Sequence, residues 1–290
     1  MLTDPSFWLV QGLNSLQLAM LLFLLSVGLT VIFGLMNFVN LAHGSLYALG
    51  ALIGYSIAEA SGSVFLAFLL APLAVTAVGA LLYITLIERL RSAGPLPQVL
   101  VTFGLIFVLM DAQRYLWGSD ALGVTGDVPF SGTIHIGSEP YPAYRLFIIA
   151  VGIAVFAGLY LLLNRTRLGA EVRAGVDDAE TAAALGVNVE RTFFLVFLLG
   201  CGLAGLAGAV AMPAFSAEAG MGVEILVPTL VVVVVGGLGS LSGAFVGSLV
   251  IGVTLTFGTA LFPDFAGIAM YAALVAVLLL RPKGLLPARS

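Results

Sequence analysis

The sequence predicts an all-α, polytopic membrane protein with about eight to ten transmembrane or half-spanning helices. Of its 290 residues, 61% are hydrophobic and only 9% are charged, whereas a soluble domain carries about 25% charged residues. Apolar stretches long enough to cross a bilayer core of about 30 Å recur along the whole chain. Runs such as 226–235 and 272–280 are apolar on every face, unlike the alternating strands of a membrane β-barrel. We therefore expect a single transmembrane domain over residues 1–290.

The expected spans follow the apolar stretches in order along the chain. They are 8–36, 43–58, 64–88, 98–117, 144–163, 193–213, 225–236, 243–261 and 266–280. The spans 43–58 and 225–236 are short for a full crossing, so each is interpreted as a half-helix that enters from one side. The 35 glycines fit this class, because small residues let membrane helices approach closely.

The basic residues predict the orientation of these spans, because loops rich in Lys and Arg stay in the cytoplasm. Nine of the eleven fall in segments on one face, namely Arg89, Arg91, Arg165, Arg167, Arg173, Arg191, Arg281, Lys283 and Arg289. That face and the C-terminus are expected to be cytoplasmic. The loop 118–143, with Asp120, Asp127 and Glu139, is expected to lie on the opposite, outer face.

A faint internal echo runs through the chain. The segment 50–54 resembles 243–247, and both copies follow a short or interrupted span. Paired interrupted segments in the two halves of a transporter indicate a repeat with the pathway between the copies. Chance matches also arise in a chain rich in Gly, Ala and Leu, so both interpretations stay open.

The segment 37–44 interrupts an apolar stretch with Asn37, Asn40 and His43. Amide and imidazole groups are costly in lipid, so they must face protein, water or a solute. One interpretation is a tight turn in which Asn40 caps the following helix. The other is that Asn37, Asn40 and His43 line a solute path.

The run 28–44, which contains these residues, resembles the signature of branched-chain amino acid ABC transporter permeases, the shorter of two permease subunits. The resemblance continues through 165–169, 177–188, 236–244 and 281–285, so it covers essentially the whole chain. It implies two ATP-binding subunits that carry ATP and magnesium, a second homologous permease subunit and a periplasmic solute-binding protein. It also implies alternating access in the bacterial inner membrane, with the loop 118–143 in the periplasm and no cofactor in this chain. Relatives in this family carry urea, short amides or other amino acids, so the solute stays open.

The polar insert 164–191 mixes charges with apolar residues, which is typical of a solvated loop or a short amphipathic helix. The resemblance implies that it is the coupling loop that docks on an ATPase subunit, with its helix near 177–185. Leu185 is the expected anchor, and Gly186 is expected to end the helix. The expected coupling residues are Gly169, Asp177, Asp178, Ala182, Leu185 and Gly186.

Two further patterns are singled out. Asp111 and Arg114 stand three residues apart near the outer end of a span, which favours a mutual ion pair, with a clamp for a zwitterionic solute as the alternative. Gly236, Gly237 and Gly239 form a glycine-rich stretch without the Lys that a phosphate loop requires, so we expect a helix break there.

No carboxylate pair, activated nucleophile or metal-ligand cluster is evident in the sequence, so we expect a transporter rather than an enzyme. The first alternatives to a branched-chain amino acid permease are an ABC permease for urea or amides and one for sugars or nucleosides. A stand-alone secondary transporter is the alternative from a different class. The expected surroundings are the lipid bilayer and protein partners, with no nucleic acid.

Overall fold

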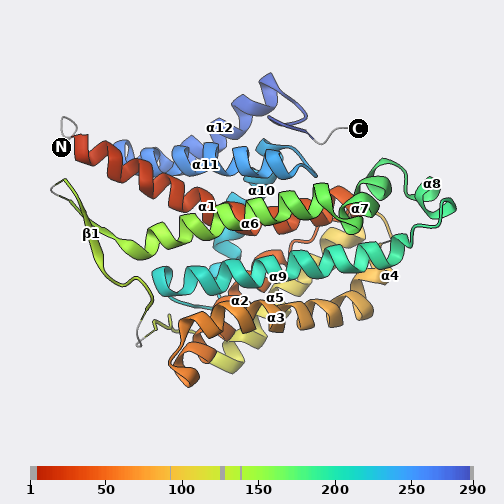
Figure 1. Cartoon of the computed structure of the whole chain (residues 1–290), viewed down its shortest axis with the longest axis horizontal. Coiled ribbons are helices and arrows are strands. Elements are labelled where there is room, and N and C mark those ends of the chain that lie inside the picture. The colour runs from red at the N-terminus through yellow and green to blue at the C-terminus, as the bar shows by residue number, and fades with distance from the viewer. Residues whose placement is uncertain (1–4, 92, 125–127, 138, 288–290) are drawn as a thin grey trace.

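The computed structural model describes residues 5–91, 93–124, 128–137 and 139–287. Asp127 and Arg289, which the orientation argument used, lie outside these residues. The long helices run roughly side by side along one axis (Figure 1). The first half of the chain forms α1 (Pro5–Met36), α2 (His43–Ser61), α3 (Val64–Leu82), the π-helix η1 (Tyr83–Ile87), α4 (Glu88–Leu90), α5 (Pro95–Trp117), β1 (Thr133–Ile136) and β2 (Glu139–Pro142). The second half forms α6 (Ala143–Arg165), α7 (Arg167–Asp177), α8 (Ala179–Ala184), α9 (Val189–Phe215), α10 (Met221–Gly236), α11 (Leu241–Leu261), the 3-10 turn η2 (Pro263–Phe265) and α12 (Ala266–Leu280).

Six helices of the described chain are long and apolar enough to cross a membrane, which confirms the all-α polytopic class. They are Pro5–Met36, Val64–Leu90, Pro95–Trp117, Ala143–Arg165, Val189–Phe215 and Leu241–Leu261. The shorter apolar helices Met221–Gly236 and Gly267–Leu280 accompany them. At 19 residues, α2 is longer than the expected span 43–58. Its first half is fully enclosed by protein, so its backbone is shielded from lipid along that stretch.

The loop 118–143 contains a small hairpin that the sequence analysis did not predict. β1 pairs antiparallel with β2, with Thr133 opposite Pro142. A separate pair of backbone hydrogen bonds joins Leu122 to Ala217, with N–O distances of 2.9 and 2.8 Å. The loop is therefore fastened to the segment that follows α9. It lies at the opposite end of the molecule from α7 and α8 (Figure 1).

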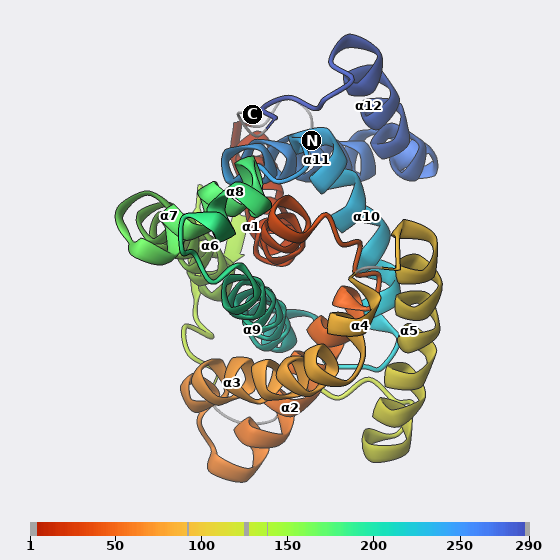
Figure 2. The same cartoon turned by 90° about the vertical axis from the view of Figure 1, so that its right-hand side faces the viewer.

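The first helix forms the centre of the fold. Viewed along the long axis, α1 is enclosed by α6, α9, α10 and α11 (Figure 2), and it packs against each of them. Residues 19–32 of α1 are all buried, as expected for a helix that is apolar on every face and sits inside a large membrane protein. By contrast, α5 and α12 lie at the periphery (Figure 2).

The helix contacts are consistent with an internal repeat. Suppose that α1, α2 and α3 correspond to α9, α10 and α11. The contacts α1–α11, α2–α9 and α2–α3 then correspond to α9–α3, α10–α1 and α10–α11, and all six contacts occur. The exchange pairs α2 with α10. The sequence echo instead matched 50–54 of α2 with 243–247 of α11, so the arrangement of helices does not follow that echo.

Glycines allow the closest helix contacts in the structure. A Cβ atom added to Gly50 of α2 would lie 2.4 Å from the carbonyl oxygen of Gly205 in α9. One added to Gly44 of α2 would lie 2.2 Å from the carbonyl oxygen of Gly222 in α10, and the reverse distance is 2.4 Å. Any side chain at these positions would push the backbones apart. In lipid, where helix association rests on van der Waals packing, this close approach is the main source of cohesion.

We predict that Gly50→Ala destabilises the protein, because its methyl group meets backbone that cannot yield locally. The expected cost is about 1–3 kcal/mol, measured as a lower melting temperature of the purified protein in detergent. Gly158→Ala in α6 is the matched control, since no atom lies within 4 Å of its added Cβ. That variant should be neutral or slightly more stable, because Ala favours helix over Gly by up to about 1 kcal/mol. Equal melting temperatures for the two variants would contradict the packing argument.

Candidate functional site at the α1–α2 break

The chain reverses direction between α1 and α2 through the segment 37–42. The amide of Asn37 donates to the carbonyl of Phe33 at 2.8 Å and ends α1. Asn37 then takes a left-handed conformation with φ of 47°, which asparagine tolerates better than most residues. Its side chain is exposed. Asn37 therefore turns the chain at the surface and does not join the buried groups described below.

Asn40 is buried, with 2% of its surface exposed. The N-cap position of α2 is Ala42, and no side chain caps this helix, so the interpretation of Asn40 as the cap of α2 is wrong. The side-chain oxygen of Asn40 has no hydrogen-bond partner among the described residues. A buried amide oxygen without a donor costs about 1–3 kcal/mol, and such an exception calls for an explanation. A solute that brings an N–H or O–H donor would satisfy it.

His43 is fully buried and holds α2 against α1. Its Nε2 atom lies 3.0 Å from the carbonyl oxygen of Leu25. Because a carbonyl only accepts, Nε2 carries the proton of this bond and Nδ1 is left as the acceptor of a neutral ring. Nδ1 has no partner in the described chain. The ring fills the space beside Gly28, where α1 comes close to Gly200 of α9, so His43 has a clear structural role.

The face of α5 that looks toward the break carries buried polar residues that the sequence analysis missed. Thr102 donates to the carbonyl of Gln98 at 2.8 Å and lies 3.4 Å from the carbonyl of Val39 in the break. The Nε2 atom of Gln113 donates to the carbonyl of Ser45 in α2 at 2.9 Å. The side-chain oxygens of Gln98 and Gln113 have no donor among the residues described. Positions 98, 102 and 113 share one face of a helix, and this spacing is the signal that could have revealed them.

We call the set Asn40, His43, Gln98, Thr102 and Gln113 the polar seam. Thr102 lies where α5 meets the break, and Gln113 lies where α5 meets α2. Gln98 lies toward the end of α4, where its Nε2 atom donates to the carbonyl of Leu90 at 3.2 Å. His43 lies on the side of α2 that faces α1. Apolar residues close the junction on the side of α10, where Leu226 packs with Ala42 and Ile106. The close approach of Gly44 and Gly222 brings the start of α10 to the same place. The part of the seam around the break therefore lies where the start of α2 meets the shorter helix α10.

Asp111 and Arg114 do not join the seam. They form an ion pair with an N–O distance of 3.7 Å, and the exposed fractions of their side chains are 75% and 47% respectively. Both lie on the side of α5 that faces away from α2. The structure therefore contains the ion pair between Asp111 and Arg114 that their spacing favoured. This pair lies away from the break.

The expected coupling residues form an arm at the other end of the molecule. The insert 164–191 folds into two helices, α7 and α8, rather than one near 177–185. Asp178 separates them, because its carboxylate accepts from the amides of Glu180 and Thr181, each at 3.0 Å, and from the hydroxyl of Thr181. These hydrogen bonds, with that of the Thr181 hydroxyl the largest, lower the pKa of Asp178.

The other residues of this arm differ in exposure. Gly169 is buried near the start of α7, where an added Cβ would meet the carbonyl of Leu163. Ala182 is buried and Asp177 is exposed. Leu185 follows α8 with 81% of its surface exposed, and Gly186 turns the chain with φ of 91°. The side chain of Leu185 is therefore accessible from outside the chain.

The glycine-rich stretch after α10 is a break between two helices. α10 ends at Gly236, and Gly237 and Gly239 have φ of 111° and 75°. The side chain of Ser240 then caps α11 by accepting from the amide of Gly243 at 3.0 Å. Gly236 and Gly243 are in close mutual contact, so α10 and α11 meet at a tight angle beside the end of α1.

Comparison with known proteins places this fold in a family. The family model described as "Branched-chain amino acid transport system / permease component" matches residues 12–278. The chain belongs to this family. As a permease component it is a multi-pass membrane protein, in agreement with its six long apolar helices.

Named relatives of the permease cover nearly its full length. It is 26% identical over 293 residues to the high-affinity branched-chain amino acid transport system permease protein BraD of Pseudomonas aeruginosa, covering 96% of this chain and 95% of the relative. It is 26% identical over 302 residues to the protein LivH of Escherichia coli, which has the same descriptive name, covering 97% and 96%. The ribose import permease protein RbsC of Escherichia coli is 28% identical over 261 residues, covering 86% and 78%. No solved structure matches the permease.

Proposed function

We propose that this chain is the membrane-spanning permease subunit of an ATP-driven importer for branched-chain or related amino acids. The match of residues 12–278 to the family model is the observation that carries the proposal. Two relatives named for branched-chain amino acid transport cover almost the whole chain. A sugar import permease is the second candidate, because relatives named for ribose and fructose import match 86% and 58% of the chain.

In the proposed mechanism, a periplasmic binding protein delivers the solute and the permease alternates between outward-open and inward-open states. Two ATP-binding subunits supply the energy, and a second homologous permease subunit completes the membrane part. The seam contributes acceptor oxygens at Asn40, Gln98 and Gln113 that lack donors within the described chain. Such oxygens suit the ammonium group of an amino acid. Around the break the seam lies beside α10, which at 16 residues is short for a membrane crossing, and short or interrupted helices mark the solute path in transporters.

Uptake into proteoliposomes tests the function. The permease reconstituted with its ATPase, permease and binding-protein partners should accumulate leucine, isoleucine or valine only when ATP is supplied. Uptake of ribose or urea in preference to these amino acids would favour the alternative importers. Uptake by the chain alone, driven by an ion gradient, would contradict the proposal and indicate a secondary transporter.

We predict that Asn40→Leu lowers uptake by at least about tenfold while the amount of protein in the membrane changes little. A loss of about 1.4 kcal/mol in the free energy of solute binding corresponds to a tenfold loss of affinity. The side-chain oxygen of Asn40 has no hydrogen-bond partner among the described residues, so the change to Leu breaks no hydrogen bond to that oxygen. Asn37→Gly is the control, because Asn37 is exposed outside the seam and glycine adopts its left-handed conformation without strain. If uptake and abundance fall together in Asn40→Leu, the seam has only a structural role.

The arm provides a test of coupling. Leu185→Asp should insert normally but lose the ATPase subunits, or lose solute-stimulated ATP hydrolysis, because an unpaired carboxylate in a buried groove is strongly disfavoured. The loss in co-purified ATPase is expected to exceed about tenfold. Asp120→Asn changes charge by one unit in the opposite loop and should affect neither property. If complexes of Leu185→Asp keep both ATPase subunits and full solute-stimulated hydrolysis, Leu185 is not the anchor of the coupling contact.

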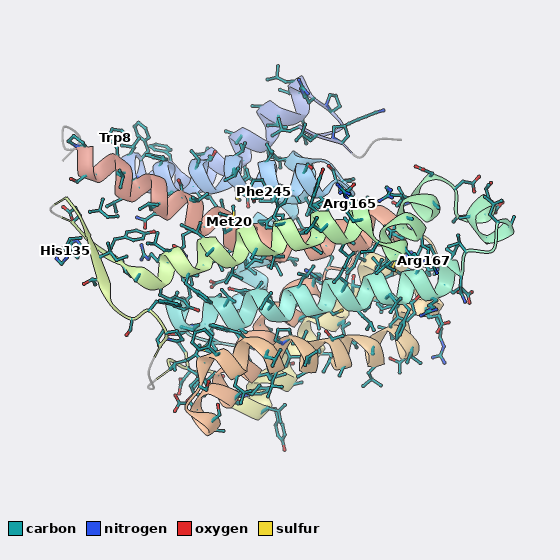
Figure 3. All side chains as sticks on the ribbon, in the orientation of Figure 1. Trp8, Met20, His135, Arg165, Arg167 and Phe245 are labelled. Atoms are coloured by element: carbon teal, nitrogen blue, oxygen red, sulfur yellow. The ribbon has the colours of Figure 1, made fainter. Side chains whose placement is uncertain are left out.

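The orientation is tested by labelling single cysteines. The basic residues Arg165 and Arg167 lie toward the end that carries the arm, whereas His135 and Trp8 lie toward the opposite end (Figure 3), an asymmetry that supports a cytoplasmic arm. In a Cys201→Ala background, a cysteine at Ser131 should react with an impermeant reagent from outside and one at Thr181 only from inside. Cys201 itself is buried. The reverse pattern would invert the proposed topology.

A further inference from the structure

An open apolar groove lies on the outside of the helix bundle, away from the seam. It has a volume of about 400 Å³ and is lined by α3, by α9 and by the start of α7. The residues that matter below are Leu73 of α3, Leu168 of α7, and Leu195, Leu199 and Leu206 of α9. Figure 2 shows α3 and α7 on either side of α9. Leu73 is 59% exposed, so the groove opens to the surroundings of the bundle.

The dimensions of the groove match one leaflet of a bilayer. Along α9 it extends from Leu195 to Leu206, which corresponds to about 16 Å at the helical rise of 1.5 Å per residue. Half of a hydrocarbon core is about 15 Å thick. Apart from Thr76, whose hydroxyl donates to the carbonyl of Pro72, the groove is lined by apolar side chains and a glycine. Its natural occupant at this depth is a hydrocarbon chain.

A basic residue stands at one end of the groove. Arg191 precedes Leu195 by four residues and therefore lies on the same face of α9. Arg167 directly precedes Leu168 at the start of α7 and lies about 100° from it around the helix, beside the groove face rather than on it. Both arginines are exposed, and neither forms an ion pair within the described part of the chain. The nearby carboxylate of Glu171 accepts from the hydroxyl of Thr192 at 3.2 Å, and Glu190 lies about 100° away from Arg191 around the helix.

We propose that this groove binds an anionic phospholipid. One acyl chain lies along α9 between α3 and α7, and the phosphate is held by the guanidinium group of Arg191 with support from Arg167. A guanidinium presents paired donors that match phosphate oxygens, so it suits this headgroup better than a single ammonium. The acyl chain of the lipid makes the apolar contacts, and the arginines select a negatively charged headgroup. A free phosphate ion would make no use of the apolar length of the groove, so the two parts together indicate a lipid.

Fluorescence quenching by brominated lipids tests this proposal. The probe is Leu73→Trp in the full chain, with Trp8 and Trp117 replaced by Phe, reconstituted in phosphatidylcholine vesicles. Phosphatidylglycerol with brominated acyl chains is added in increasing proportion, and brominated phosphatidylcholine is added in a parallel series. The anionic lipid should quench the probe with about fivefold higher apparent affinity, since one basic group near the surface contributes about 1 kcal/mol.

Two arginine variants and one control complete the experiment. Arg191→Gln should remove the preference for phosphatidylglycerol, and Arg167→Gln should weaken it. Lys283→Gln removes the same charge from an exposed residue outside the groove and should leave the preference unchanged. Unchanged helical circular dichroism in each variant would show that folding is intact. Equal quenching by the two lipids, no quenching by either, or a preference that survives Arg191→Gln would overturn the proposal.

Discussion

The fold depends on the close approach of α1 to the helices around it. Glycines on several sides allow this approach: Gly28 faces Gly200 of α9, and Gly34 faces Gly239 in the break before α11. Gly252 of α11 faces Ala19 of α1. Lipid tails are as apolar as leucine, so the hydrophobic effect does not hold membrane helices together as it does in water. Dispersion contacts between closely spaced backbones take its place, and each such contact requires a residue without a side chain. With α1 fixed between α9 and α11, the positions of the short helices α2 and α10 follow.

The enclosure of α1 also explains how the structure tolerates a polar break. Backbone that is not helical is acceptable at membrane depth only where protein or water covers it. Phe38, Asn40 and Ala42 of this segment are buried, with α5 on one side and α10 on another. His43 bonds to α1 and keeps the start of α2 in place, while Asn40 keeps an unpaired oxygen. His43, which anchors α2 to α1, and Asn40, whose side-chain oxygen is unpaired, are thus three residues apart. Unpaired buried polar groups are expected mainly where a protein gives up some stability for function.

The sequence predicted the helices well because an apolar run of sufficient length has few alternatives in a membrane. It predicted helix ends less well, because helices continue through polar residues after the apolar run stops. α9 begins at Val189, where the side chain of Asn188 caps it, rather than at the expected residue 193. The hairpin of β1 and β2 was missed because strands of four residues give almost no periodic signal.

The candidate site was predicted only in part, for a related reason. The polar character of 37–44 is visible in the sequence, but the face that each span turns inward is not. Gln98, Thr102 and Gln113 were therefore overlooked although they are buried on the inward face of α5, whereas Asp111 and Arg114 were included although they point away. The phase of α5 is set by its contacts with α2 and α10, and a helix that is apolar on most of its surface carries little information about that phase.

The central position of α1 has a consequence for the order in which the protein is built. α1 is the first helix of the described chain to leave the ribosome, yet it packs chiefly against α9 and α11, which are synthesised near the end. Until α9 and α11 are inserted, the surface of α1 must contact lipid. Its mean hydropathy of 2.6 is high enough for a helix exposed to lipid. Within the described chain, α1 is thus enclosed only after α9 and α11 have followed it into the bilayer.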